Sequence, residues 1–138
     1  MPTSKEFTIR MEDRPGTLGK ACQALADRGV NILAFQSFPT GGESLVRFVV
    51  DNPTAAKTLL DTERLTYTEA EVAVVKLSHR PGQLAQAAAR LGDANININY
   101  AYCGLEAGTN VPLLIFGVAE VARAVTILEQ AAAAAGGT

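Results

Sequence analysis

Long apolar runs and strong charge of either sign are both missing from this 138-residue chain. No run approaches the roughly 20 apolar residues that a membrane span needs, and residues 1–6 lack the apolar core of a secretion signal. The net charge is −2, and the twelve basic residues are scattered rather than clustered. We therefore expect a cytoplasmic protein that binds neither membrane nor nucleic acid.

Residues that carry catalysis or bind metals are also scarce: the chain has one histidine, two cysteines and no tryptophan. No G-x-S-x-G pattern places a serine nucleophile, and no metal-ligand spacing is present. The glycines at 41–42 and 104–108 lack phosphate-binding spacing and are interpreted as hairpin turns. We expect no catalytic residues, no metal and no cofactor, and hence a protein that is not an enzyme.

The chain contains an internal duplication. Arg14-Pro15-Gly16-Thr17-Leu18 returns 66 positions later as Arg80-Pro81-Gly82-Gln83-Leu84, and Val30-Asn31-Ile32 returns as Ile96-Asn97-Ile98. Cys22 and Cys103 fall at non-equivalent places in this repeat, which argues against a shared disulfide or metal framework. One unit covers about half the chain, so two modules are expected, over residues 1–69 and 70–138.

Hydrophobic periodicity predicts the elements of the first unit. Strands are expected at 7–11, 30–38 and 43–50, with a hairpin turn at 40–42 and the second strand beside the first. Leu18, Ala21, Cys22 and Leu25 form the apolar stripe of a helix that Gly29 caps, and Asn52-Pro53 opens a second helix. The order strand-helix-strand-strand-helix recurs in the second unit, where Leu84 heads the equivalent stripe.

This order predicts an α+β fold of two ferredoxin-like βαββαβ modules in tandem, each with an antiparallel sheet and its helices on one face. Residues 65–77 must serve both as the fourth strand of the first unit and as the first strand of the second. We expect one long strand there. No residues remain for a fourth strand in the second unit, so another chain is expected to complete that sheet edge.

The two Arg-Pro-Gly-x-Leu elements are the strongest candidates for a binding site. Each lies where a strand leads into a helix, so the first backbone N–H groups of that helix, around residues 16–18 and 82–84, offer a seat for a carboxylate. Glycine allows close approach to the backbone. A purely structural role of these residues in a tight turn is equally compatible with the pattern.

Asn31 and Asn97 form the second equivalent pair, each at the head of the second strand of its unit. A side-chain amide accepts a hydrogen bond from an ammonium group and donates one to a carboxylate, and an α-amino acid carries both groups. An asparagine that is merely tolerated at a loop-to-strand junction explains the pattern as well.

The two Arg-Pro-Gly-x-Leu elements and the asparagines that follow them resemble the hallmark of the ACT domains. These are small ferredoxin-like modules that bind amino acids and regulate enzymes of amino-acid metabolism. The resemblance covers nearly the whole chain and implies a stand-alone protein of two ACT modules. In that family the ligand lies between two modules, held by the loop before the first helix and by the head of the second strand. The resemblance implies the following ligand-binding residues: Asp13, Arg14, Pro15, Gly16, Thr17, Leu18, Asn31, Ile32, His79, Arg80, Pro81, Gly82, Gln83, Leu84, Asn97 and Ile98.

Asp13 and His79 occupy the same repeat position, where serine-regulated members of the family carry a polar amide. A carboxylate neutralises a ligand ammonium, whereas a neutral imidazole only accepts a hydrogen bond from it, so the two sites are expected to differ. We expect a homodimeric amino-acid sensor, with an amino-acid-metabolism enzyme as a further partner. The alternative is an interaction subunit that dimerises without binding a ligand, and a small hydrolase on the same scaffold is the weakest reading.

Overall fold

The computed structural model describes residues 3–134, which divide into two compact units: Lys5–Ala70, and a second unit made of Thr3, Ser4 and the described residues from Glu71 onward. The division passes through two strands. Thr3 and Ser4 of β1 (Thr3–Glu12) belong with the second unit, and the first four residues of β4 (Tyr67–Lys76) belong with the first. The outer ends predicted for the two modules, residues 1 and 138, lie outside the described residues.

The unit Lys5–Ala70 has the order strand-helix-strand-strand-helix-strand. Between β1 and β4 it contains α1 (Thr17–Asp27), β2 (Ile32–Thr40), β3 (Glu43–Val50) and α2 (Pro53–Thr62). β3 pairs antiparallel with both β1 and β2. The expectation that β2 runs beside β1 is therefore wrong, because the helical connection between these strands leaves room for β3 to enter between them. Arg10 of β1 donates its backbone N–H to the carbonyl of Thr66, the residue before β4, at 3.3 Å.

Local sequence signals explain the boundaries of these elements. Gly41 and Gly42 take φ values of 58° and 82° between β2 and β3, as a two-residue hairpin turn of the mirror-image type requires. Asn52 caps α2 by accepting a hydrogen bond from the N–H of Ala55 at 3.1 Å, and Pro53 follows at the first helical position. Gly29, with φ of 71°, ends α1 as predicted.

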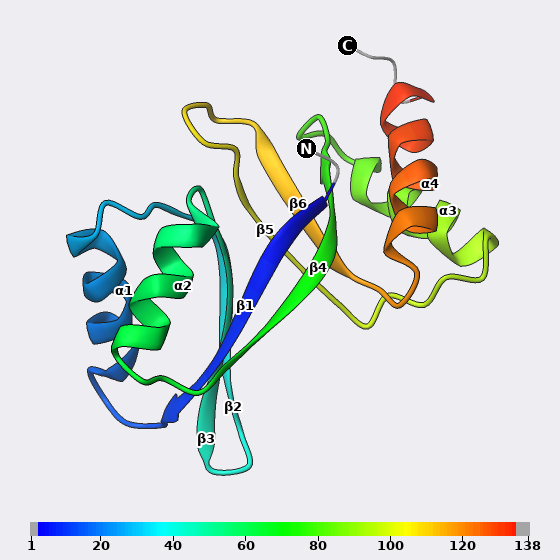
Figure 1. Ribbon diagram of the computed structural model, residues 1–138. Helices are drawn as coiled ribbons and strands as arrows, with labels where there is room; N and C mark the ends of the chain where they lie inside the picture. Colours follow the sequence, from blue (N-terminus) through cyan, green and yellow to red (C-terminus); the bar gives the residue numbers. More distant parts are fainter. Residues whose placement is uncertain (1–2, 135–138) are drawn as a thin grey trace. The chain divides into compact units, whose positions relative to one another are not determined.

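One apolar core joins the helices and strands of this unit. Figure 1 shows α1 and α2 lying beside each other against these strands. Alternate residues of the strands and one stripe of each helix make up the buried cluster: Phe7, Ile9, Leu25, Val30, Val46, Phe48, Val50, Ala56, Leu59 and Leu60. Phe7 and Phe48 stack at its centre with ring centroids 5.7 Å apart.

The other unit repeats this arrangement with α3 (Gln83–Asp93), β5 (Tyr100–Leu105), β6 (Pro112–Gly117) and α4 (Val121–Ala134). β6 pairs antiparallel with both β4 and β5, and α3 and α4 contribute to one core with them. The second strand of this unit, whose head was expected at Asn97, begins only at Tyr100. Leu84 is 54% exposed, so it does not continue the buried stripe of α3 as predicted.

The long strand predicted over residues 65–77 is present as β4 and is shared between the units. The sequence leaves no residues after α4 for a fourth strand in the second unit. β1 begins at Thr3, before the predicted start at Phe7, and its first residues belong to the compact unit that contains β4, β5 and β6. Thr3 and Ser4 therefore contribute to this unit.

Tyr67 of the first unit has a raised pKa. Its hydroxyl donates a hydrogen bond to Asp61 at 2.5 Å, and this bond raises the pKa of Tyr67 to about 12. Since the folded state favours the neutral phenol, the stabilisation is fully present below the ordinary tyrosine pKa and is lost as the pH rises through about 12.

Tyr67→Phe removes the tyrosinate absorbance of one residue. We therefore expect the absorbance that is lost in this variant to titrate near pH 12 in the wild type. The measurement is the difference between alkaline absorbance titrations of the wild type and the variant, taken while circular dichroism still reports a folded protein. Asp61→Asn keeps the side-chain size and removes the charge, so it should lower this pKa. A difference that titrates at the ordinary tyrosine pKa would contradict the hydrogen bond.

Candidate functional site

The two predicted loops adopt the same backbone conformation at the junctions of β1 with α1 and of β4 with α3. Gly16 and Gly82, the residues that precede the two helices, have φ values of 93° and 89° and ψ values of −16° and −14°. A side chain at either position would have open space around its Cβ, so glycine is needed for the left-handed backbone rather than for close packing. The repeated motif therefore encodes a specific turn at each helix start.

The first turn of each helix leaves two backbone donors unused. Thr17 and Gln83 donate their N–H groups to the carbonyls of Arg14 and Arg80, at 3.4 and 3.3 Å. The N–H groups of residues 17 and 83 are therefore not free, in contrast to the prediction. Among the described residues, no acceptor faces the next two N–H groups of either helix, namely those of Leu18 and Gly19 in α1 and of Leu84 and Ala85 in α3.

Neither helix start carries a side-chain cap or an acidic residue in its first turn, in contrast to the Asn52 cap of α2. Unpaired N–H groups and the positive end of the helix dipole together favour a bound anion. Both helix starts therefore have unpaired donors and a positive partial charge, which favour a carboxylate.

The side chains of the two loops differ. In the first loop, Thr17 donates its hydroxyl to the carbonyls of Glu12 and Arg14 at 2.9 and 3.1 Å, and the Arg14 guanidinium pairs with the Glu12 carboxylate at 2.5 Å. Asp13 is exposed, as are Pro15 in this loop and His79, Arg80 and Pro81 in the other. The first loop is thus held by its own hydrogen bonds.

Gln83 stands where the first loop has Thr17, and its side-chain oxygen Oε1 is buried without a hydrogen-bond partner. An unsatisfied buried carbonyl costs about 1–3 kcal/mol. Such a cost at the start of a helix with two free N–H groups is explained if a donor from outside the chain completes the site. Gln83 belongs to the repeated motif, but no local sequence pattern indicates that its amide oxygen is buried without a partner.

Asn31 and Asn97 lie away from the loops of their own units. Each follows the helix that the loop precedes, and an 11-residue helix such as α1 or α3 is about 16 Å long. The N–H of Asn31 donates to the Asp51 carboxylate at 2.9 Å, and the Asn97 amide donates to Asn99 at 3.0 Å. Neither unit by itself brings the asparagine and the loop together.

The two isoleucines next to these asparagines take part in packing. Ile32 and Ile98 are half-buried and pack against the cores of their respective units. Their side chains therefore have a structural role that does not depend on a ligand.

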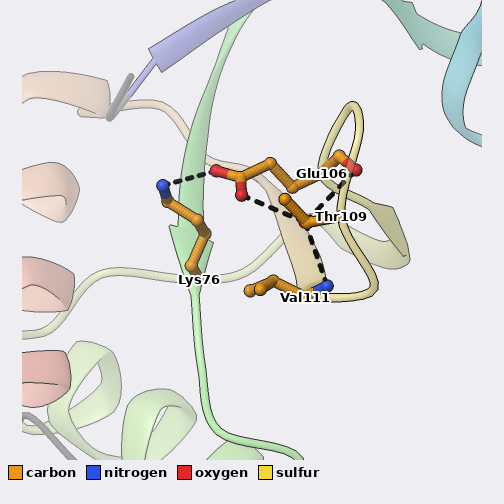
Figure 2. A network of polar contacts seen from close by, with 4 residues as sticks. All are labelled: Lys76, Glu106, Thr109 and Val111. Carbon is orange, nitrogen blue, oxygen red and sulfur yellow. Dashed lines mark hydrogen bonds and ion pairs between the residues drawn. The ribbon is translucent and has the colours of Figure 1, made fainter.

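A polar network missed by the sequence analysis lies just ahead of the second loop. Figure 2 shows Lys76, the last residue of β4, paired with Glu106 in the β5–β6 turn at 2.5 Å, while Thr109 donates to the other Glu106 oxygen at 3.1 Å and accepts from the N–H of Val111. Lys76 and Thr109 both hold the pKa of Glu106 below its usual value. The network fastens the hairpin turn to the strand that leads into the second loop.

The first unit has a related contact: Arg10, which matches Lys76 in the repeat, faces Glu43 at 3.9 Å. A basic residue near the end of the first strand with an acidic residue at the hairpin was therefore the signal available in the sequence.

Within residues 3–134, histidine, cysteine, aspartate and glutamate side chains form no group of three that could hold a metal ion. No helix in the same range is long and apolar enough to cross a membrane.

Comparisons with known proteins agree with this architecture. Residues 6–65 match the family model of the ACT domain. No curated protein sequence matches the chain. Among solved structures, protein BT0572 from Bacteroides thetaiotaomicron is 21% identical with a TM-score of 0.81, over 94% of this chain and 88% of that one.

The regulatory subunits of aspartate kinase from Thermus thermophilus and Thermus flavus have similar folds. They are 21% and 20% identical, with TM-scores of 0.64 and 0.62. The matches cover 94% and 95% of this chain and 92% and 93% of those subunits. Residues 6–65 are therefore similar to the ACT domain, and the described fold is similar to that of the aspartate kinase regulatory subunits along nearly its whole length.

Proposed function

We propose that the protein is a non-catalytic amino-acid sensor built from two tandem ACT modules, over residues 1–69 and 70–138, each with its helices on one face of its sheet. The match at residues 6–65 supports the first module. The second is supported by the repeated motif and by the almost identical backbone at Gly16 and Gly82. Regulation of enzymes is the role named for the aspartate kinase subunits of similar fold.

The proposal is carried by two observations on neighbouring residues: the unpaired Oε1 of Gln83 and the free N–H groups of Leu84 and Ala85. An α-amino acid offers both complements: its carboxylate accepts from the backbone donors, and its ammonium group donates to the amide oxygen. The corresponding ligand in the first loop, which lacks this acceptor, would use the exposed carboxylate of Asp13. We expect the second loop to bind more tightly, because it relieves an existing cost.

The proposed sites place Asn31 or Asn97 on a different module from the loop that it assists, because one helix separates each pair within a unit. A ligand that bridges two modules favours the arrangement in which they meet, by its differential affinity for that arrangement. A homodimer provides such an arrangement. The amino acid would then change the affinity of the dimer for its partner, for which an enzyme of amino-acid metabolism is our candidate.

The test is the melting temperature of the full chain against each standard amino acid. A ligand at about 100 times its dissociation constant adds roughly 2.7 kcal/mol to the free energy of unfolding, which raises the melting temperature by several degrees. We expect Gln83→Leu to raise the melting temperature of the free protein, since it removes a buried unsatisfied oxygen, and to reduce the response to the amino acid.

Gly82→Val should abolish the response of the second loop. Its matched control is Gly108→Val in the β5–β6 turn, where φ is 75° against 89° at Gly82 and the Cβ again meets open space. Both variants carry the strain of a left-handed valine, but only Gly82→Val alters the loop. A response that survives both Gly82→Val and Gly16→Val would show that the loops are not the site. No response to any amino acid would favour the dimerising interaction subunit without ligand binding.

A further inference from the structure

An apolar cavity of about 30 Å³ lies inside the unit Lys5–Ala70, between the two helices and the sheet. Val46 and Phe48 of β3 contribute to one side, Cys22 of α1 and Leu59 of α2 to the others, and Phe35 of β2, which is 50% exposed, also lines it. A water-sized group needs about 10–15 Å³, so the cavity has room for two or three heavy atoms. This is the size of the end of an aliphatic chain.

The chemistry of the lining selects against polar groups. Every lining side chain is apolar except the Cys22 thiol and the exposed Glu63 carboxylate. Burial raises the pKa of Cys22, which keeps its thiol neutral. Water bound here would lack the two to four polar partners that it needs, whereas apolar cavities of this kind stay dry and accept apolar guests.

We propose that this cavity binds the apolar end of a small uncharged aliphatic molecule, at a site that shares Leu18 with the first loop. The Glu63 carboxylate at the lining repels an anionic head group, so an aliphatic alcohol should bind in preference to the carboxylate of the same chain length. The site is specific to the unit Lys5–Ala70, because two of its lining residues have different counterparts in the other unit. The repeat partner of Cys22 is Ala88, and the partner of Leu18, another lining residue, is the exposed Leu84.

The two cysteines of the full chain provide the first test, since Cys22 lines the cavity and Cys103 is exposed on β5. Alkylation of each thiol by iodoacetamide is followed by mass spectrometry with increasing 1-hexanol. At about nine times the dissociation constant of the alcohol, Cys22 should react about tenfold more slowly, because only the empty fraction is reactive, while the rate at Cys103 stays constant. Hexanoate should protect Cys22 less well. Equal slowing of both thiols, or no slowing of Cys22, would overturn the proposal.

A filling substitution provides the second test. Cys22→Met places a longer side chain in the cavity, and Ala88→Met makes a similar change at the equivalent position of α3. In methyl NMR spectra, 1-hexanol should shift the signals of Leu59 and Ile32 in the wild type and in Ala88→Met, and leave them unchanged in Cys22→Met. Shifts that persist in Cys22→Met would contradict the site. The thiol protection experiment decides the question without any variant if Cys22→Met does not fold.

Discussion

Replacing Phe48 with alanine is expected to lower the free energy of unfolding of the unit Lys5–Ala70 by about 3–5 kcal/mol. The Phe48 side chain is 2% exposed and stacks on Phe7 at the centre of the core. Its removal loses both the transfer free energy of the ring and the contacts around the space that remains. Urea denaturation followed by circular dichroism measures the change.

Phe38→Ala is the matched control, since it makes the same chemical change on β2 where the ring is 38% exposed. The guanidinium of Arg47 lies 5.6 Å from the centre of this ring, and a cation–π contact at an exposed site contributes about 0.5–1 kcal/mol. We expect a cost near that range. Equal costs for Phe38→Ala and Phe48→Ala would show that the core of this unit is not packed around Phe48.

Gly117→Ala is expected to destabilise the second unit by about 1–3 kcal/mol, the usual range for overpacking. Tyr100 lies opposite Gly117 in the β5–β6 pair, and a Cβ at residue 117 would lie 2.2 Å from the nearest atom of its ring. The ring would have to move, and it stacks on Tyr102 with centroids 6.4 Å apart. Thermal and urea unfolding of the full chain measure the effect.

Gly92→Ala in α3 serves as the control because no atom lies within 4 Å of the new Cβ and the backbone is helical. It should stabilise the protein by about 0.5–1 kcal/mol, so the same substitution has opposite signs at the two sites. Gly117→Ala should cost less in a Tyr100→Ala background than in the wild type, because the ring that obstructs the Cβ is gone. A Gly117→Ala protein as stable as the wild type would show that the Tyr100 ring does not occupy this position.

Several features of the candidate site follow from local sequence alone. The positive φ angles at Gly16, Gly82 and Gly29 were signalled by glycine next to a helical pattern. Asn95, the repeat partner of Gly29, takes the same left-handed backbone with φ of 61°, and asparagine tolerates that conformation better than most residues. The location of each turn is therefore available from residue type and spacing.

The start of β5 and the environment of α3 were predicted less well. Asn97 and Asn99 alternate with apolar residues as a strand would, yet pairing with β6 begins only at Tyr100. Leu84 continues the helical period of α3, but the described residues leave it 54% exposed. Alternation describes a side chain's direction, whereas burial depends on what is packed against it.

The sequence by itself determined the duplication, the two turns at Gly16 and Gly82 and the order of the elements, because these depend on backbone preferences and on periodicity over a few residues. Tertiary structure alone decided that β3 lies between β1 and β2, that β1 is shared by two units, and that Gln83 buries an unpaired oxygen. Strand order and burial depend on hydrogen bonds and packing between residues far apart in the chain, and no local pattern specifies those partners.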